Sequence, residues 1–507
     1  MKRVLSLALA LTTTLVLATA VQGAGAEPRV VVVEGGTVPG TSKHLKLVGH
    51  NPLLNRGMNA AMAVLDDSGY LYIGSRTDGD PDHPNAGILV VDASDPSDPT
   101  IVNEIGPPHA ANPSETTREL RIWQEQKLLI VLTFTCSAVI HHCEGSVAPN
   151  FRFFDLSDPA NPEFIMNFVP SQASGTIRTP HEFFLWVDPS NPDRAYIWAT
   201  LPTGSTNPAN PNLGVWDISG AASGTTPRLL AQGNWNNQYE LGGVSSEFDG
   251  RLANHSMDVS ADGRTTTLAY QRGHTLVLDT AEVVDSPPAP GTVLDLNDNL
   301  LTPPANRPQW GTARDGCIAE CAESHSAEQV PGRDLIINTD EIYGTFTIPF
   351  HGCPWGWVHV IDSSDPANPE IVSEYKTTKN VCPADDPLTQ QFTSYASHNP
   401  TVTENLVLVT WHSAGFQVID IANEARPRQA GWFSPTPLPA VATEDPALNG
   451  GPNKVTMWSY PVVDDGLIYV IDLRNGLYVL EYRGKFPGEI RKLDFLEGNS
   501  NQGDGAG

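Results

Sequence analysis

ILVVDASDPSDPTIV begins at Ile88, FRFFDLSDPANPEFI at Phe151 and VHVIDSSDPANPEIV at Val358. Each phrase is a run of β-forming residues that ends in an aspartate, followed by a turn and a second β-rich run. Fainter copies, such as FQVIDIANEARPRQAG from Phe416, bring the number to seven. Their acids are Asp92, Asp155, Asp217, Asp279, Asp362, Asp420 and Glu481, spaced 63, 62, 62, 83, 58 and 61 residues apart. Seven copies at a nearly constant period predict a repeat fold.

The rest of each period supplies two more strands. The sixth unit, HNPTVTENLVLVTWHSAG from His398, holds two β-rich stretches separated by a turn. The fourth unit turns at Asp262-Gly263 and the seventh at Asp465-Gly466, and Asp-Gly between two such stretches is a strong hairpin signal. Four short antiparallel strands make one propeller blade. The sequence therefore predicts an all-β chain that folds as a single seven-bladed β-propeller.

The last unit lacks an outer strand, because the chain becomes charged and Gly-rich after Tyr482. A run near the other end, HLKLVGH from His44 to His50, can supply that strand and close the ring without a long unpaired edge. The 83-residue interval contains a Pro- and Asn-rich insertion between Asp285 and Cys321, which we expect to be a surface loop. The predicted organisation is a signal peptide over 1–26, a linker over 27–43, the propeller over 44–484 and a disordered tail over 485–507.

The repeated acids have a structural explanation. An aspartate at a strand end accepts hydrogen bonds from backbone N–H groups two residues on, and a following proline pre-sets the turn. The phrase itself resembles the LVIVD repeat family, named for the same apolar run and aspartate. The resemblance extends from about Met58 to Tyr482 and is strong at the first, second and fifth copies. It implies an exported propeller, and it carries over no catalytic residue.

The N-terminus is typical of an export signal. Lys2 and Arg3 give a positive start, and Val4 to Ala20 is an apolar stretch interrupted only by Ser and Thr. Small residues offer cleavage sites after Ala20 and after Ala26. A membrane anchor is the alternative, but the segment is short, and no second apolar run approaches the ~20 residues that span a bilayer. We expect a soluble mature protein that is secreted or periplasmic.

The chain is acidic, with a formal net charge of −28 at pH 7. Nucleic acid requires a basic footprint, so the charge argues against it as a partner, and adhesion to anionic lipid is disfavoured for the same reason. A solvated exterior explains the acidity, which also suits divalent cations and cationic partners. We expect a monomer whose partner is a protein, a glycan or a small molecule.

Six cysteines in an exported chain usually form disulfides. Closeness in the sequence favours three local pairs, Cys136–Cys143, Cys317–Cys321 and Cys353–Cys382, among the 15 pairings that six cysteines allow. A metal site built from Cys136, His141, His142 and Cys143 is the alternative. An oxidising compartment favours the disulfide.

Four histidines occupy one register in four consecutive units. Each lies seven residues before a hairpin turn: His181 before Asp188, His255 before Asp262, His325 before Gly332 and His398 before Asn405. The same place falls near Glu119 in the second unit and at Trp458 in the seventh. Because equivalent positions of successive blades meet around the axis of a propeller, we expect these side chains to converge there.

By antiparallel geometry, the start of an inner strand shares a rim with the end of the next strand. That rim also receives Asp340, Glu341, His412, Asp472 and Arg474. Neutral imidazoles on rigid strands suit Zn, Cu, Ni or Fe, and an open coordination position activates water or binds oxygen. The alternative is structural, since repeats copy residues along with folds. A wide channel would also hold the nitrogens too far apart for Zn–N bonds of ~2.0–2.1 Å.

A second candidate site lies in RTDGDPDHPN, which begins at Arg76. Asp78, Asp80 and Asp82 alternate along this loop, and such oxygens suit a hard cation such as Ca²⁺. The later glutamate of an EF-hand is missing. A solvated turn is the alternative interpretation.

No catalytic motif of known mechanism is present in the sequence. The first hypothesis is a secreted binding module that acts through one rim of the channel. The second is a metal-dependent oxidase or hydrolase in which His181, His255, His325 and His398 bind Zn or Cu. Its candidate catalytic residues are Asp340, Glu341 and His412. The third is a metal-free hydrolase or lyase that uses Glu119 and a histidine as acid and base.

Overall fold

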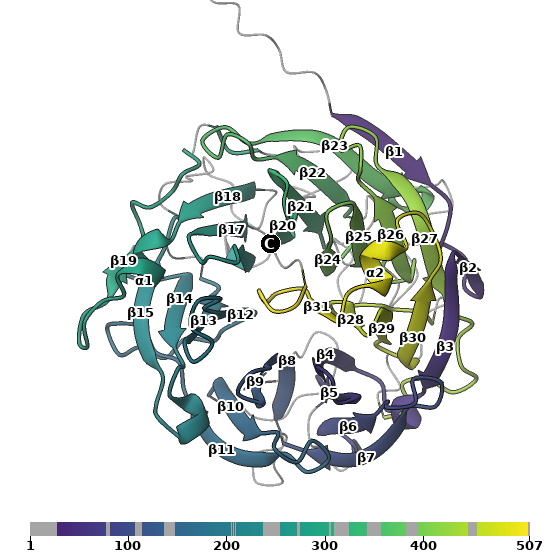
Figure 1. Ribbon diagram of the computed structural model, residues 1–507, viewed down its shortest axis with the longest axis horizontal. Helices are drawn as coiled ribbons and strands as arrows, with labels where there is room; N and C mark the ends of the chain where they lie inside the picture. The colour runs from purple at the N-terminus through teal and green to yellow at the C-terminus, as the bar shows by residue number, and fades with distance from the viewer. Residues whose placement is uncertain are drawn as a thin grey trace, which may run out of the picture.

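A computed structural model describes residues 28–77, 82–106, 114–135, 148–203, 205, 207, 209–236, 254–270, 274–303, 306–308, 324–341, 356–381, 394–444 and 454–504. These residues build seven β-sheets that follow one another around a central axis (Figure 1). The predicted seven-bladed β-propeller is confirmed. The signal peptide, all six cysteines, Asp78 and Asp80 lie outside the described residues, so the predictions made for them remain predictions.

Each blade runs outward from the axis in chain order, apart from strands added by distant segments. Blade 1 is β4 (Asn59–Leu65), β5 (Tyr70–Ser75), β6 (Ile88–Asp92) and β7 (Thr100–Ile105). Blade 2 is β8 (Glu115–Trp123), β9 (Leu128–Thr135), β10 (Asn150–Asp155) and β11 (Glu163–Phe168). Blade 3 is β12 (Phe183–Val187), β13 (Ala195–Thr200), β14 (Leu213–Asp217), β15 (Arg228–Gly233) and the added β19 (Leu294–Asp295). Blade 4 is β16 (Asn254–Val259), β17 (Thr265–Tyr270) and β18 (His274–Asp279).

The remaining three blades each gain a strand from the N-terminal region. Blade 5 is β20 (Ser324–Gln329), β21 (Leu335–Asp340), β22 (Val358–Asp362), β23 (Glu370–Thr377) and the outermost β1 (Arg29–Val33). Blade 6 is β24 (Pro400–Val402), β25 (Leu406–Thr410), β26 (Phe416–Asp420), β27 (Arg428–Ser434) and β2 (Thr41–Lys43). Blade 7 is β31 (Phe495–Glu497), β28 (Val462–Asp464), β29 (Leu467–Asp472), β30 (Gly476–Tyr482) and β3 (Leu45–Asn51).

Helices are few and short. Among the described residues, the α-helices are α1 (Ala281–Asp285) and α2 (Gly488–Arg491), and 3-10 turns span Leu53–Asn55, Ala221–Ser223 and Thr378–Val381. Within the described ranges, no helix has the length and apolar character needed to cross a bilayer.

The repeated phrase forms the third and fourth strands of a blade, and its acid closes the third. In six blades the aspartate Oδ1 accepts the backbone N–H two residues on, at 2.7–3.0 Å. This bond holds the turn, as the sequence predicts. In blade 7 Glu481 pairs with the side chain of Arg483 instead. The acids are therefore structural elements of the blade edge.

Blade 4 departs from the expected four strands. After β18 the insertion forms α1, and its strand β19 joins blade 3, where Ala231 and Gln232 pair in parallel with Leu294 and Asp295. Leu296, which follows, is buried. The expectation of a surface loop between Asp285 and Cys321 is therefore wrong for this part, because apolar residues of the insertion cover the edge of blade 3.

The ring is closed as predicted, by β3 pairing antiparallel with β30, with Leu47 opposite Leu480. The predicted linker over 27–43 is wrong. Its residues form β1, which runs parallel to β23, and β2, which runs antiparallel to β27. Backbone groups at the outer edges of blades 5 and 6 need partners, and the two short strands supply them.

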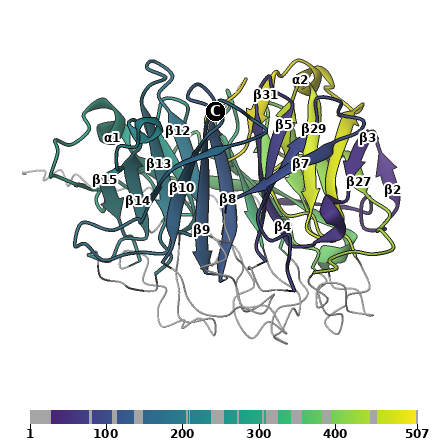
Figure 2. The ribbon, with the colours of Figure 1, turned by 90° about the horizontal axis from the view of Figure 1, so that it is seen from below.

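The predicted disordered tail over 485–507 is also wrong, because residues 485–504 are packed. Phe495 and Leu496 are buried, and β31 pairs antiparallel with β28. The chain then enters the middle of the ring, where Asn499 is fully buried (Figures 1 and 2). The charged, Gly-rich composition conceals this docking, because polar side chains of the segment bind backbone groups of the inner strands.

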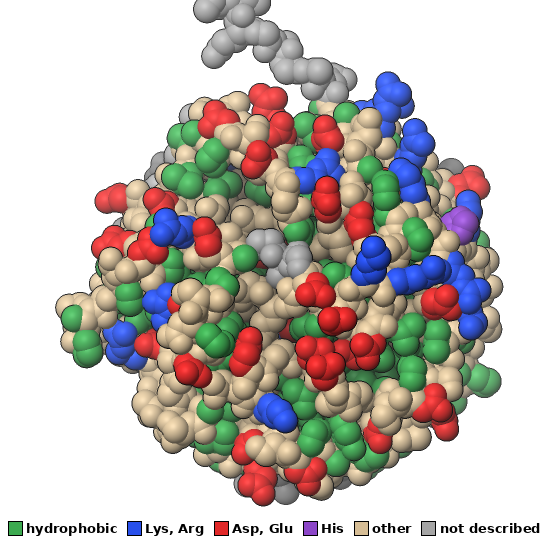
Figure 3. All heavy atoms as spheres, viewed as in Figure 1, with side chains coloured by type: hydrophobic (Ala, Val, Ile, Leu, Met, Phe, Trp, Pro, Cys, Tyr) green, Lys and Arg blue, Asp and Glu red, His purple; other side chains and the backbone are tan. Residues whose placement is uncertain are grey.

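Adjacent blades pack face to face through apolar clusters. Between blades 3 and 4 the cluster includes Phe184, Trp198, Met257 and Leu268. Strands covered on both faces read as continuous apolar runs, which explains the composition of the repeated phrase. On the face where the C-terminal segment enters, acidic side chains gather near the axis (Figure 3). Burial and then the neighbouring carboxylates raise the pKa of Asp464 there to about 7.

Candidate metal centre

A repeated β-bulge aims side chains of the innermost strands at the axis. In β16, Asn254 pairs with Tyr270 and Ser256 with Ala269, so His255 is an extra, unpaired residue. The same shift in β20 makes His325 the extra residue. A bulge breaks the alternation of side chains along a strand and redirects the extra one. The shared sequence position of these histidines is therefore the extra residue of a β-bulge.

Blades 3 and 6 repeat the pattern just before their inner strands. Thr200 is opposite two residues. Its backbone carbonyl accepts the N–H of His181, and its own N–H donates to the carbonyl of Glu182, both at 3.0 Å. In blade 6, Thr410 has the same relation to His398 (2.9 Å) and the next residue.

In blade 2 the extra residue is Arg118, because Thr117 pairs with Thr133 and Glu119 with Leu132. The sequence predicts Glu119 near this position, one residue beyond Arg118. Only the pairing register of β8 and β9 decides which of the two residues is the extra one.

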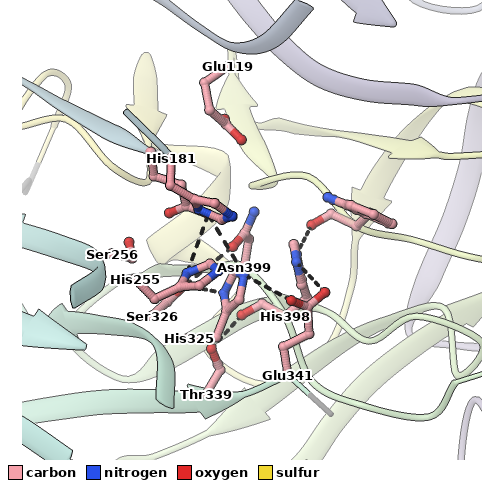
Figure 4. A network of polar contacts seen from close by, with 12 residues as sticks. Glu119, His181, His255, Ser256, His325, Ser326, Thr339, Glu341, His398 and Asn399 are labelled. Carbon is pink, nitrogen blue, oxygen red and sulfur yellow. Dashed lines mark hydrogen bonds and ion pairs between the residues drawn. The ribbon is translucent and has the colours of Figure 1, made fainter. Parts of the chain in front are cut away.

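The four histidines form a continuous stack (Figure 4). Ring centroids lie 4.2 Å apart for His181 and His255, 4.0 Å for His255 and His325, and 4.0 Å for His325 and His398. His412, from the end of the next strand, lies 5.0 Å from His398. All but the half-buried His181 are buried. The channel is therefore narrow enough to bring the imidazoles into contact.

Glu341 is the centre on which three imidazoles converge. Its Oε1 lies 2.9 Å from His398 Nε2 and 3.3 Å from His412 Nε2, and its Oε2 lies 3.4 Å from His325 Nε2. Two ligands of one metal ion with bonds of about 2.0–2.2 Å lie about 3–3.5 Å apart. The three distances are close to this spacing; the donor atoms of Glu341, His398 and His412 all lie within 4.8 Å of one another, and His325 belongs with His255 and Glu341 to a second such set.

Each of these imidazoles is held by its other nitrogen. Nδ1 of His325 bonds the Ser326 hydroxyl at 3.0 Å, and Nδ1 of His412 bonds the Ser394 hydroxyl at 2.9 Å. Nδ1 of His398 contacts the backbone carbonyl of Trp458. Such bonds on the outer nitrogen fix ring orientation in metal-binding histidines. All three Nε2 atoms are thereby directed toward Glu341.

The contact between His398 and Trp458 also determines a proton position. A carbonyl oxygen only accepts, so Nδ1 of His398 carries the hydrogen. In the neutral ring, Nε2 then presents a lone pair to Glu341 Oε1 at 2.9 Å. Two acceptors at this distance repel one another unless a proton or a metal cation lies between them.

Glu182 provides a second carboxylate at the other end of the stack. Its Oε1 lies 3.7 Å from His325 Nε2 and 3.9 Å from His255 Nδ1. Both Glu182 Oε2 and His255 Nδ1 are buried without a hydrogen-bond partner. Three sets of donors have atoms within 4.8 Å of one another: His181–Glu182–His255, His255–His325–Glu341 and Glu341–His398–His412.

Burial governs the protonation of the cluster. Desolvation lowers the pKa of His255 to about 3 and holds the pKa of His325 well below its usual range. Burial alone would raise the pKa of Glu341, but the imidazoles of His398 and His325 outweigh it and hold that pKa well below the usual range. Burial, reinforced by Glu119, raises the pKa of Glu182 to about 8. The neutral imidazoles of His255 and His325 suit a divalent metal.

The other predicted site residues lie apart from this cluster. Asp340 Oδ2 pairs with His359 Nε2 at 3.0 Å, one strand further out. Glu119 faces the cluster from across the axis, but its ion pairs are with Arg76 at 4.0 Å and Arg121 at 3.5 Å (Figure 4).

Two further predicted positions show no sign of a metal site. Asp82 belongs to none of the metal-sized donor groups among the described residues. Asp472 accepts hydrogen bonds from the backbone N–H groups of Thr456, Arg474 and Asn475.

Sequence reasoning missed Glu182 and Arg118. Glu182 follows His181, and the equivalent residues of the next three blades are Ser256, Ser326 and Asn399. That second column was visible in the sequence, but its significance depends on the bulge. Arg118 donates from Nη2 to His181 Nε2 at 2.5 Å, and its Nε also donates to the His181 carbonyl. His181 is therefore engaged by a guanidinium at the edge of the cluster.

Comparisons with known proteins identify no family for this chain. No family model matches the chain, and no curated protein matches its sequence, so membership of the LVIVD repeat family stays a prediction. Among solved structures, Sqt1 of Saccharomyces cerevisiae is 8% identical, with a TM-score of 0.46 over 88% of this chain and 100% of that one. The Cps50 (Swd1) β-propeller domain of Myceliophteria thermophila is 8% identical, with a TM-score of 0.45 over 86% of this chain and 99% of that one.

Proposed function

We propose that this protein is a metalloenzyme whose metal ion is held in the channel by Glu341 and by the imidazoles of His325, His398 and His412. The observation that carries the proposal is the convergence of three Nε2 atoms on one carboxylate, with each Nδ1 already bonded elsewhere. A cation between His398 Nε2 and Glu341 Oε1 removes the repulsion between two buried acceptors.

The donor set restricts the chemistry. Imidazole with carboxylate suits Zn or Cu and lacks the thiolates of a purely structural site. A bound zinc ion would supply a Lewis acid and an activated water for hydrolysis, whereas copper would supply oxidation. Glu182 lies beside His255 and, with its raised pKa, holds a proton at neutral pH. It is the residue that we assign to proton transfer at this site.

Elemental analysis tests the proposal. Protein purified from medium replete in Zn and Cu, or reconstituted and desalted, should carry about one equivalent of one of these metals. Glu341→Gln and His398→Gln should each reduce the bound metal at least about tenfold. His50→Gln is the matched control, because His50 stacks on Tyr478, away from the axis, and should leave the metal content unchanged.

A protonated His398 paired with Glu341 is the competing explanation of the 2.9 Å contact. Wild-type protein that takes up neither metal, and whose thermal stability neither metal raises, would establish that explanation and reject the metal centre.

A binding role through one rim is the broader alternative. β-Propellers commonly serve as protein-interaction modules, and one fold hosts many functions. On the described surface no feature singles out a protein, a glycan or a small molecule as the partner. Export to an extracellular or periplasmic space remains part of the proposal and is tested by sequencing the N-terminus of the mature protein.

A further inference from the structure

The ring of side chains around the metal cluster has two chemically different halves. Blades 3 to 6 contribute the imidazoles and the two glutamates described above. Blades 7, 1 and 2 contribute an aromatic ring and two guanidinium groups: Trp458, Arg76 and Arg118. Trp458 joins the halves, because its ring lies 5.3 Å from the His398 ring and 4.5 Å from the guanidinium carbon of Arg76.

Arg76 is buried, at 4% exposure, at the inner end of blade 1, directly after β5. Its backbone is fixed by a hydrogen bond from its N–H to the Met58 carbonyl. Its guanidinium stacks on Trp458, and its nearest carboxylate, Glu119, lies 4.0 Å away. The Nε of Arg76 has no hydrogen-bond acceptor. A planar donor group therefore faces the cluster with hydrogen-bonding capacity unused.

A second buried arginine of the same blade differs from Arg76 in this respect. Arg56 donates to the side chain of Asn59 and to four backbone carbonyls at 2.6–3.1 Å. Its guanidinium donors are therefore used in hydrogen bonds within the fold. A buried donor without an acceptor costs about 1–3 kcal/mol, and more when the group is charged. The unpaired Nε of Arg76 carries this free-energy cost, which an acceptor on a bound ligand would remove.

The charges nearby do not satisfy Arg76. Glu119 is shared with Arg121, whose Nη1 lies 3.5 Å from it. Arg118 brings another positive charge beside His181, and after burial it is the chief cause that lowers the pKa of that histidine. Arg121 pairs in addition with Glu497 at 3.9 Å, whereas Glu119 at 4.0 Å is the one carboxylate among the described residues that pairs with Arg76.

We propose that Arg76 binds the oxyanion group, a carboxylate or phosphate, of the small molecule on which the metal centre acts. The arginine fork matches the two oxygens of such a group and pairs with it through two parallel hydrogen bonds. The stack of Arg76 on Trp458 holds the fork in place, and the other neighbour of the Trp458 ring is His398. This inference rests on the proposed metal centre for its chemistry, and it makes the substrate class an organic acid or a phosphate ester.

The test is calorimetric titration of the full-length protein, in metal-free and metal-loaded form, at low ionic strength. The probes are oxalate, acetate and inorganic phosphate, with acetamide as the uncharged match for acetate. The metal-free wild type should bind the anions and ignore acetamide. Arg76→Gln should weaken anion binding at least tenfold. Arg426→Gln is the matched control, because Arg426 is exposed in a turn of blade 6, and it should bind as the wild type does.

Arg76→Lys keeps the charge without the fork and provides a second variant in case Arg76→Gln does not fold. It should weaken oxalate binding more than phosphate binding, because oxalate uses both arms of the fork. The stronger response to oxalate or to phosphate in the wild type distinguishes a carboxylate from a phosphate substrate.

The outcomes separate the two proposals. Anion binding that Arg76→Gln and Arg76→Lys leave unchanged, or no binding to wild type in either form, overturns the oxyanion site. Protein that binds anions through Arg76 but takes up no metal retains the oxyanion site and rejects only the metal centre.

Discussion

At the scale of single residues, the direction of each nitrogen lone pair decides what the channel can hold. His398 is the key residue, since its Nδ1–H donates a hydrogen bond to the backbone carbonyl of Trp458 and its Nε2 faces Glu341. A histidine on an apolar face usually satisfies both nitrogens within the fold. Here burial keeps His325 neutral and aims its Nε2 at the same carboxylate. This arrangement is the observation on which the proposed metal site rests.

The ionisation of Glu497 predicts how the free energy of unfolding changes with pH. Burial raises its pKa to about 7, although Arg121 lies 3.9 Å away and lowers it. Between pH 4.5 and 7 the folded carboxyl keeps a proton that the unfolded chain has lost, so this group costs stability as the pH rises. Glu497→Gln carries no charge at any pH. Its free energy of unfolding relative to wild type should therefore rise by on the order of 1–3 kcal/mol from pH 5 to pH 8.

Urea unfolding at several pH values measures this difference, and Glu163→Gln on the exposed edge of blade 2 is the control. A difference between Glu497→Gln and wild type that stays constant across the pH range would show that Glu497 ionises normally.

At the scale of elements, two local features determine the site. The bulge in the inner strands turns Arg118, His255 and His325 toward the axis, whereas regular alternation would separate neighbouring side chains onto opposite faces. The C-terminal segment fills the opposite end of the channel. Gln502 binds the backbone near the end of β8, and Asn501 binds that of Val187 at the end of β12, while the histidines lie at the strand starts. The histidine cluster therefore lies at the other end of the channel from this segment.

Asn499 tests the role of this segment. Its side-chain amide donates to the Phe183 carbonyl at 2.6 Å in a fully buried position. Asn499→Ala leaves that carbonyl without its donor, and we expect a loss of about 1–3 kcal/mol in the free energy of unfolding. Asn161→Ala, which removes an exposed amide, should cost much less. Equal losses in the two variants, measured by urea unfolding, would mean that the segment does not stabilise the ring.

At the scale of the whole molecule, closure couples the blades. Each blade packs on both neighbours, so the histidine stack exists only while blades 3 to 6 keep their angles. The N-terminal strand β3 completes blade 7 and joins the two ends of the chain. Closure holds the blades at fixed angles, so that side chains of blades 5 and 6 meet around Glu341.

Removal of residues 1–51 tests closure. It exposes the edge of β30, whose ladder bonds to β3 each contribute about 0.5–1.5 kcal/mol. We expect a loss on the order of 5 kcal/mol or aggregation through the open edge. Removal of residues 1–39 keeps β2 and β3 and deletes only the outermost strand of blade 5, so it should cost less. Thermal unfolding measures both, and the same loss in the two truncations would contradict closure by β3.

The sequence by itself determined the repeat, the hairpins, the closing strand and the register of four histidines, because strand period and turn chemistry are local properties. Only the tertiary structure decided that Glu182 joins the cluster, that Arg118 and not Glu119 continues the column, and that the C-terminal segment packs in the channel. These facts depend on which atoms of different blades meet across the axis. Distances between atoms of different blades are set only when the ring closes, so they cannot be read from the order of residues.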